Sequence, residues 1–188
     1  MISKISDPCN KRFHANQVSG IRPLTDVHLI VMHVAENPSA ESVAADFSTT
    51  TREASAHLVV DDTACYRCLE NDEIPMAAPG ANTDGFHIEQ AGFASWSAAE
   101  WETHLETIQR AAYKAAFHCK RFGLPAQWLE VDDLLNGQHG ITDHFIVNQM
   151  AKKMSLAGDH SHTCPGTIWP RKTFMKWVHH YHETLSAG

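Results

Sequence analysis

An apolar run near the start of the chain constrains the fold more than any other feature. Residues 27–34 read Val-His-Leu-Ile-Val-Met-His-Val, a nearly continuous series of β-branched and other aliphatic side chains. A run of this length and composition is typical of a strand that lies inside a sheet. We therefore predict a buried strand over these residues that ends at His33.

The periodicity of the chain after this run predicts further strands and helices. The predicted strands cover residues 55–61, 64–69 and 85–92, and the first two form a hairpin. The predicted helices are a short one capped by Ser39, a long one from Ser97 to Phe122, one from Thr142 or Asp143 to about Lys153, and one from Pro170 to about Leu185. Ser97 and Glu100 have the spacing of a capping box at the start of the long helix. This order predicts an α/β fold with a central mixed β-sheet flanked by helices.

The size of the chain favours one domain. Its 188 residues, 43% of them hydrophobic, are enough to bury a core of their own. We assign residues 27–188 to a single domain. Residues 1–26, which contain Pro8, Gly20 and Pro23, are expected to form an irregular N-terminal extension packed on it.

The charge and hydropathy of the chain exclude several kinds of partner. A formal net charge of −7 and the lack of a dense Lys/Arg run argue against nucleic acid and anionic membranes. The sequence has no apolar run of about 18 residues, the length that predicts a membrane span. Its opening lacks the apolar segment of a signal peptide. We expect a protein made in the cytoplasm without membrane insertion.

The cysteines do not indicate a disulfide framework, because five is an odd number and the chain is large enough to fold without one. Cys65 and Cys68 have the C-x-x-C spacing of redox and zinc motifs, but no second such pair follows, and we interpret them as structural or incidental. His87 and Glu89 match the H-x-E of zinc deaminases. In those enzymes the Pro-Cys-x-x-Cys motif comes after H-x-E, whereas here both cysteines precede it.

A short loop concentrates side chains that bind metals. Residues 159–166 read Asp-His-Ser-His-Thr-Cys-Pro-Gly, and imidazole and thiolate are ligands that zinc prefers. A catalytic zinc takes three protein ligands and keeps one position open. With Cys164 as one ligand, His33 and His144 are candidates for the others. The alternatives are a core histidine bonded to a carbonyl for His33 and an exposed first-turn residue for His144.

Glu89 lies in the middle of the predicted strand 85–92, where a carboxylate is unusual. Buried carboxylates are rare unless they are paired or take part in chemistry. Burial also raises the pKa of a carboxyl group, as a general base beside a metal-bound water requires. Glu89 is therefore the candidate base.

These residues stand in an order that resembles the zinc-dependent N-acetylmuramoyl-L-alanine amidases, the type shared by phage endolysins, bacterial amidases and peptidoglycan recognition proteins. The resemblance covers roughly residues 25–180. It rests on five segments in sequence: Ile30-Val-Met-His33, Ala54-Ser-Ala-His-Leu-Val-Val60, Ala77-Ala-Pro-Gly-Ala-Asn82 with Gly85-Phe-His-Ile-Glu89, Thr142-Asp-His144, and His162-Thr-Cys-Pro-Gly166.

The resemblance implies a role for each matching residue. His33, His144 and Cys164 would bind one zinc ion, Glu89 would activate the water, and His162 would stabilise the oxyanion. Two substrate-groove positions, Ala81 and Asn82, also follow from it. His57, on a strand near the expected site, either lines the groove or is a packed strand residue.

The implied activity is hydrolysis of the amide bond between N-acetylmuramic acid and L-alanine in bacterial peptidoglycan. The style of the motifs suggests a phage-type lytic enzyme, monomeric and released at lysis to act on the cell wall. Two departures stand out: Ala56 occupies a position where some members have tyrosine, and Cys164 one where many have aspartate. The alternatives are a non-catalytic peptidoglycan-binding module and a zinc peptidase that cuts within the stem peptide.

Overall fold

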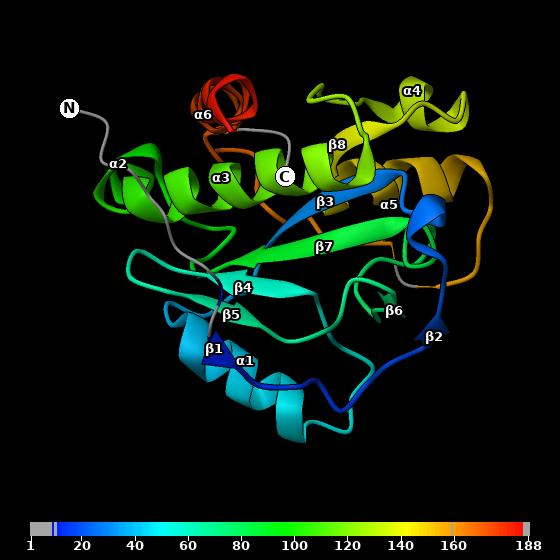
Figure 1. The fold of residues 1–188 in the computed structure, drawn as a ribbon, viewed down its shortest axis with the longest axis horizontal. Coiled ribbons are helices and arrows are strands. Elements are labelled where there is room, and N and C mark those ends of the chain that lie inside the picture. Colours follow the sequence, from blue (N-terminus) through cyan, green and yellow to red (C-terminus); the bar gives the residue numbers. More distant parts are fainter. Residues whose placement is uncertain (1–8, 10, 159, 186–188) are drawn as a thin grey trace.

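A computed structural model describes residues 9, 11–158 and 160–185 of the chain (Figure 1). The described part forms a six-stranded sheet in the order β1-β5-β4-β7-β3-β8 and a two-stranded sheet of β2 and β6. The elements are β1 (Lys11–Arg12), β2 (Gly20–Ile21), the 3-10 helix η1 (Leu24–Asp26), β3 (Leu29–Val34), α1 (Ala40–Thr49), β4 (Leu58–Val60), β5 (Cys65–Arg67), β6 (Glu73–Ile74), β7 (Gly85–Gln90), α2 (Ala98–Thr103), α3 (Leu105–Phe122), α4 (Val131–Leu135), β8 (Gly140–Asp143), α5 (His144–Lys153) and α6 (Arg171–Thr184).

The large sheet is mixed, which confirms the predicted fold class. Strand β3 runs parallel to both of its neighbours, β7 and β8, and β7 is also parallel to β4. Strand β5 is antiparallel to β4, and β1 is parallel to β5. Because parallel strands end at the same edge, the carboxyl ends of β3, β4, β7 and β8 share one edge of the sheet.

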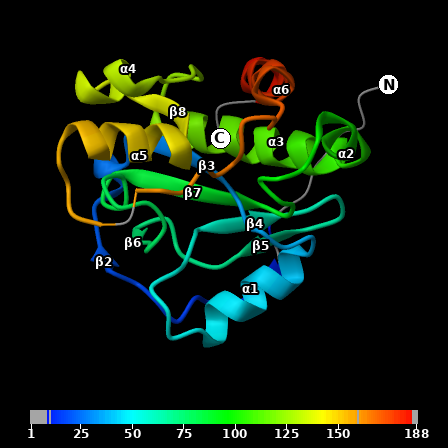
Figure 2. The same ribbon diagram turned by 180° about the vertical axis from the view of Figure 1, so that it is seen from behind.

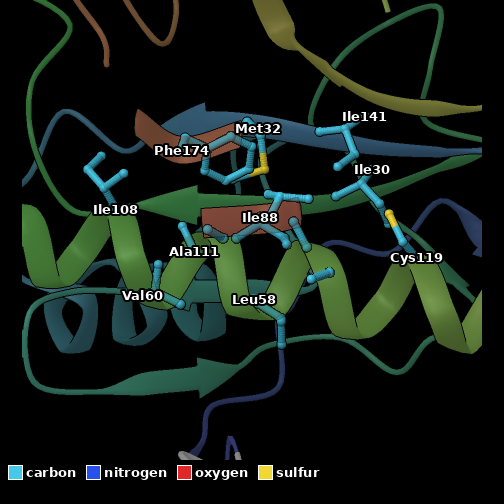
Figure 3. Packing of buried hydrophobic residues seen from close by; sticks show 14 of the residues in the cluster. Ile30, Met32, Leu58, Val60, Ile88, Ile108, Ala111, Cys119, Ile141 and Phe174 are labelled. Carbon is cyan, nitrogen blue, oxygen red and sulfur yellow. The ribbon is translucent and has the colours of Figure 1, made fainter. Parts of the chain in front are cut away.

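Helices cover both faces of this sheet. Helices α3 and α6 pack on one face, and α1 and α5 lie on the other (Figures 1 and 2). All six residues of β3 are buried. Ile30 and Met32 face the core under α3, which is drawn in Figure 3, whereas Leu29 and Val31 face α5. A strand covered on both faces needs apolar side chains at every position, which explains the continuous apolar run.

The long helix predicted from Ser97 to Phe122 is divided into α2 and α3 at His104, and a single helix was therefore a wrong prediction. The predicted capping box of Ser97 and Glu100 is present. The break arises because Asp62 approaches from the turn between β4 and β5. Its carboxylate lies 2.6 Å from Nδ1 of His104 and accepts hydrogen bonds from the backbone N–H (3.0 Å) and hydroxyl (2.7 Å) of Thr107. Asp62 thus caps α3 from outside the helix.

Several short elements also differ from expectation, and among them β6 and α4 were not predicted. The segment before residue 27 was expected to be irregular, but it contributes β1 and β2. Residues 140–143 form the parallel edge strand β8, which was not predicted. Helix α5 therefore begins at His144 and not at Thr142 or Asp143 as expected. The domain boundary after residue 26 stays a prediction, and residues 1–8 and 10 lie outside the described part.

One disulfide bond is present, although the cysteine count did not indicate a framework. It joins Cys9 to Cys65 and so links the N-terminal segment to β5. Cys68 and Cys119 are buried thiols, and Cys65 and Cys68 are therefore not bonded to each other. Within the described residues no helix is both long and apolar enough to cross a membrane.

The cap supplied by Asp62 can be tested by mutation. Asp62→Ala leaves the Thr107 N–H without its acceptor, and we expect the free energy of unfolding to fall by about 1–2 kcal/mol, as for other lost helix caps. Urea denaturation of this variant and of Glu102→Ala, an exposed residue of α2, measures the effect. Equal stability of the two variants would show that Asp62 does not cap α3.

Candidate functional site

The register between β3 and β7 places His33 directly beside Glu89. Side chains alternate between the faces of a strand, so Ile88 points into the core under α3 and Glu89 points to the opposite face. Nδ1 of His33 lies 4.0 Å from Oε1 of Glu89, and both side chains are largely buried. The candidate ligand His33 and the candidate base Glu89 therefore meet near the carboxyl edge of the sheet.

His144 joins this pair from the other side of β3. Strand β8 pairs with β3 so that Asp143 lies beside Met32, and His144 follows as the first residue of α5. The Asp143 carboxylate accepts a hydrogen bond from the Ile146 N–H at 2.8 Å and caps the helix. The rings of His33 and His144 are 4.8 Å apart between centroids.

Cys164 completes the group from the loop before α6. Its Sγ accepts a hydrogen bond from the Val34 N–H at 3.0 Å, which holds the loop against the end of β3. The ligand atoms of His33, His144 and Cys164 all lie within 4.8 Å of one another. Within the described residues this is the only His, Cys, Asp or Glu group that could hold a metal ion.

The buried polar atoms of this group fit a cation. Oε2 of Glu89 and Nε2 of His144 are buried and have no hydrogen-bond partner among the described residues. Burial raises the pKa of Glu89 to about 8, lowers that of His144 to about 4, and raises that of the Cys164 thiol well above its ordinary value. Two imidazoles and a sulfur atom are a donor set that zinc prefers, so the residues present fit a zinc ion.

The group lies in a cleft of about 580 Å³. Helix α1 supplies one wall, and residues 52–55 and Met76 and Ala77 supply another. His162 is exposed, and its ring stacks on that of His144 at 5.7 Å, so the structure brings it to the group as expected. Asn148 was missed by the sequence analysis: one turn after His144, its Nδ2 donates to the His162 carbonyl at 3.0 Å.

The structure does not bring His57, Ala81 and Asn82 to the cleft, because all three are engaged behind its wall. His57 and Ala81 have no exposed surface. Oδ1 of Asn82 accepts hydrogen bonds from the N–H groups of Ala77 (3.0 Å) and Ala78 (2.7 Å). For His57 the packed strand residue is what the geometry shows, and a contact with substrate stays a prediction for all three.

Comparison with known proteins assigns the chain to a protein family. The sequence profile of the N-acetylmuramoyl-L-alanine amidases matches residues 23–167. The chain belongs to the N-acetylmuramoyl-L-alanine amidase family. The family and the peptidoglycan amidase function expected from the sequence are thereby confirmed. No curated protein sequence matches the chain.

Solved structures share the amidase fold at low sequence identity. The Staphylococcus aureus hydrolase AmiA, solved with its ligand, is 12% identical, with a TM-score of 0.70 over 97% of this chain and 88% of that one. A mutant endolysin from Bacillus subtilis is 16% identical (TM-score 0.60; 89% and 97% covered). The amidase LysC from Clostridium intestinale is 12% identical (TM-score 0.52; 90% and 96% covered). These likenesses show the fold alone.

The raised pKa of Glu89 predicts how stability depends on pH in protein freed of metal by a chelator. The folded chain keeps this proton up to about pH 8, whereas the unfolded chain loses it near the ordinary value of 4.5. The free energy of unfolding contributed by Glu89 therefore falls as pH rises between these values. Glu89→Gln removes this loss, so its stability relative to wild type should increase by on the order of 4 kcal/mol from pH 4 to pH 9.

Denaturant titrations across this pH range measure the difference, with Glu53→Gln as control because Glu53 is an exposed carboxylate on the same cleft. A stability difference between Glu89→Gln and wild type that does not change with pH would show that Glu89 titrates normally.

Proposed function

We propose that this chain hydrolyses the amide bond between N-acetylmuramic acid and L-alanine with one zinc ion bound by His33, His144 and Cys164. The observation that carries the proposal is the convergence of these three ligand atoms within 4.8 Å, beside Glu89, in an open cleft. A binding module without catalysis has no need for a buried carboxylate at this position, and burying one costs free energy.

Glu89 is the proposed general base. Zinc bound to the three ligands would act as a Lewis acid and would acidify a water molecule. Glu89 takes a proton from the attacking water, whose oxygen adds to the lactyl carbonyl carbon. Glu89 then delivers this proton to the nitrogen of L-alanine as the C–N bond breaks. Because burial disfavours the carboxylate, Glu89 holds a proton more readily than an exposed glutamate does.

His162 is the proposed donor to the oxyanion. Its exposed ring stacks on His144 at the mouth of the group, and Asn148 anchors its backbone. An imidazole N–H at this place donates a hydrogen bond to the carbonyl oxygen as negative charge develops there.

The setting of the reaction follows from the substrate. Bacterial peptidoglycan is the proposed partner, and the proposed setting is that of a monomeric, phage-type lytic enzyme that acts on the wall after release. A Bacillus subtilis endolysin shares the fold. Disulfides persist outside the reducing cytoplasm. The Cys9–Cys65 bond therefore suits a protein that is made in the cytoplasm and works beyond it.

Digestion of purified peptidoglycan tests the reaction and the role of Glu89. Zinc-loaded protein should release new alanine N-termini, without new reducing sugars, and chelator-treated protein should not. Glu89→Ala should bind one zinc per chain yet turn over roughly 100- to 10,000-fold more slowly, because proton transfer is lost.

Glu102→Gln, on the exposed surface of α2, should keep wild-type turnover. New peptide ends other than alanine would instead indicate a peptidase, and tight binding without any product would indicate a recognition module. An active Glu89→Ala variant would exclude Glu89 as the base.

The role of His162 predicts a loss of rate without a loss of metal. His162→Gln should lower kcat by roughly 100- to 1,000-fold, the effect of removing one oxyanion donor in other hydrolases, while the zinc content stays at one per chain. His139→Gln, an exposed histidine at the other end of β8, serves as the matched control. If both variants turn over equally fast, His162 does not stabilise the oxyanion.

A further inference from the structure

His87 connects the candidate ligand His33 to the backbone behind the cleft. It lies two residues before Glu89 on β7, on the same face of the strand, and is fully buried. Nδ1 of His87 lies 2.9 Å from Nε2 of His33. Nε2 of His87 lies 3.0 Å from the carbonyl oxygen of Ala81. The two histidines and the carbonyl thus form a chain of two hydrogen bonds that ends at the candidate metal site.

The direction of both bonds follows from the carbonyl, which can only accept. Nε2 of His87 must therefore carry the proton that it donates to Ala81. In a neutral imidazole the other nitrogen then accepts, so Nδ1 of His87 takes a hydrogen bond from Nε2 of His33. This leaves the lone pair of His33 on Nδ1, the nitrogen that lies 4.0 Å from Oε1 of Glu89, and both residues line the cleft.

The surrounding backbone holds these two hydrogen bonds in place. A Cβ atom at Gly85 would lie 2.4 Å from the Ala81 oxygen and 2.5 Å from Nε2 of His87, so only glycine lets the two meet. The backbone N–H of His87 donates a hydrogen bond to Nδ1 of the His57 ring at 3.0 Å. The Ala81 turn is fixed by Asn82. His57, Ala81 and Asn82 therefore all help to hold His87 in place.

We propose that His87 is a positioning residue that fixes the tautomer and orientation of His33, so that Nδ1 of His33 is the nitrogen presented to zinc. The inference rests on the proposed zinc site. Hydrogen bonds to the second nitrogen of a ligating histidine typically change metal affinity by roughly 10- to 100-fold. His87 touches neither substrate nor metal in this role.

Two substitutions at this position separate the hydrogen bond from the space that the ring fills. Leucine has no acceptor, so His87→Leu should weaken Zn²⁺ and Co²⁺ binding roughly 10- to 100-fold. Asparagine places a carbonyl oxygen near the position of Nδ1, so His87→Asn should keep the affinity within a few-fold of wild type. Competition with a chromophoric chelator gives the affinities, and the Co²⁺ absorption spectrum reports the ligand geometry.

His118→Leu is the matched control. His118 is equally buried, on α3, where its ring stacks on Phe86 across the sheet from the site. We expect it to lose stability but to keep its metal affinity. Thermal unfolding of every variant in metal-free form separates a loss of folding from a loss of binding.

The tautomer itself is read from the metal-free wild-type protein, which needs no variant to fold. Long-range ¹H–¹⁵N NMR correlations, assigned to His33 by their loss in His33→Gln, should place its proton on Nε2. A proton on Nδ1 would overturn the proposal, and so would a His87→Leu variant that folds and binds Zn²⁺ as tightly as wild type. A wild-type chain that binds neither Zn²⁺ nor Co²⁺ would overturn the proposed function and the positioning role with it, whichever nitrogen carries the proton.

Discussion

The parallel register of β3 and β7 is the constraint on which the site depends. It aligns His33 with Glu89 and leaves both on the face away from α3. A shift of one residue in either strand would turn that side chain into the apolar core and separate the pair. The neighbouring apolar residues of the two strands, Ile30, Met32 and Ile88, oppose such a shift. Each is fully buried under α3 and would lose that packing. The packing of one face therefore fixes the chemistry of the other.

Burial of polar groups is the cost of this arrangement. His33, His87 and His57 are almost fully buried, and desolvation lowers the pKa of each. Most of their ring nitrogens are satisfied by one another or by backbone groups, which limits the loss of free energy. The atoms left without partners, Oε2 of Glu89 and Nε2 of His144, lie where the proposed reaction takes place. The site therefore keeps two buried polar atoms that a bound ion or a substrate can satisfy.

Local patterns made much of the fold predictable, and long-range contacts set the limit. The apolar run of β3 and the capping box at Ser97 depend on neighbouring residues, and both are found. The break at His104 was not predictable, because it depends on Asp62, which follows β4 and is far away in the sequence. The site residues His33, Glu89, His144 and Cys164 carry rare side chains for their positions. Ala81 and Asn82 do not, and their location behind the cleft depends on how the turn packs against His87.

The candidate ligands also lie on three segments that are far apart in the sequence. His33 belongs to the central strand, His144 begins a helix, and Cys164 lies in a loop held by the Val34 N–H and, through His162, by Asn148. An ion that binds all three residues favours the folded chain over the unfolded one, because the unfolded chain does not hold them together. Most of that gain falls on the loop, since β3 is already fixed by two neighbouring strands. The loop that carries Cys164 and His162 is therefore the part of the site whose order depends most on the metal.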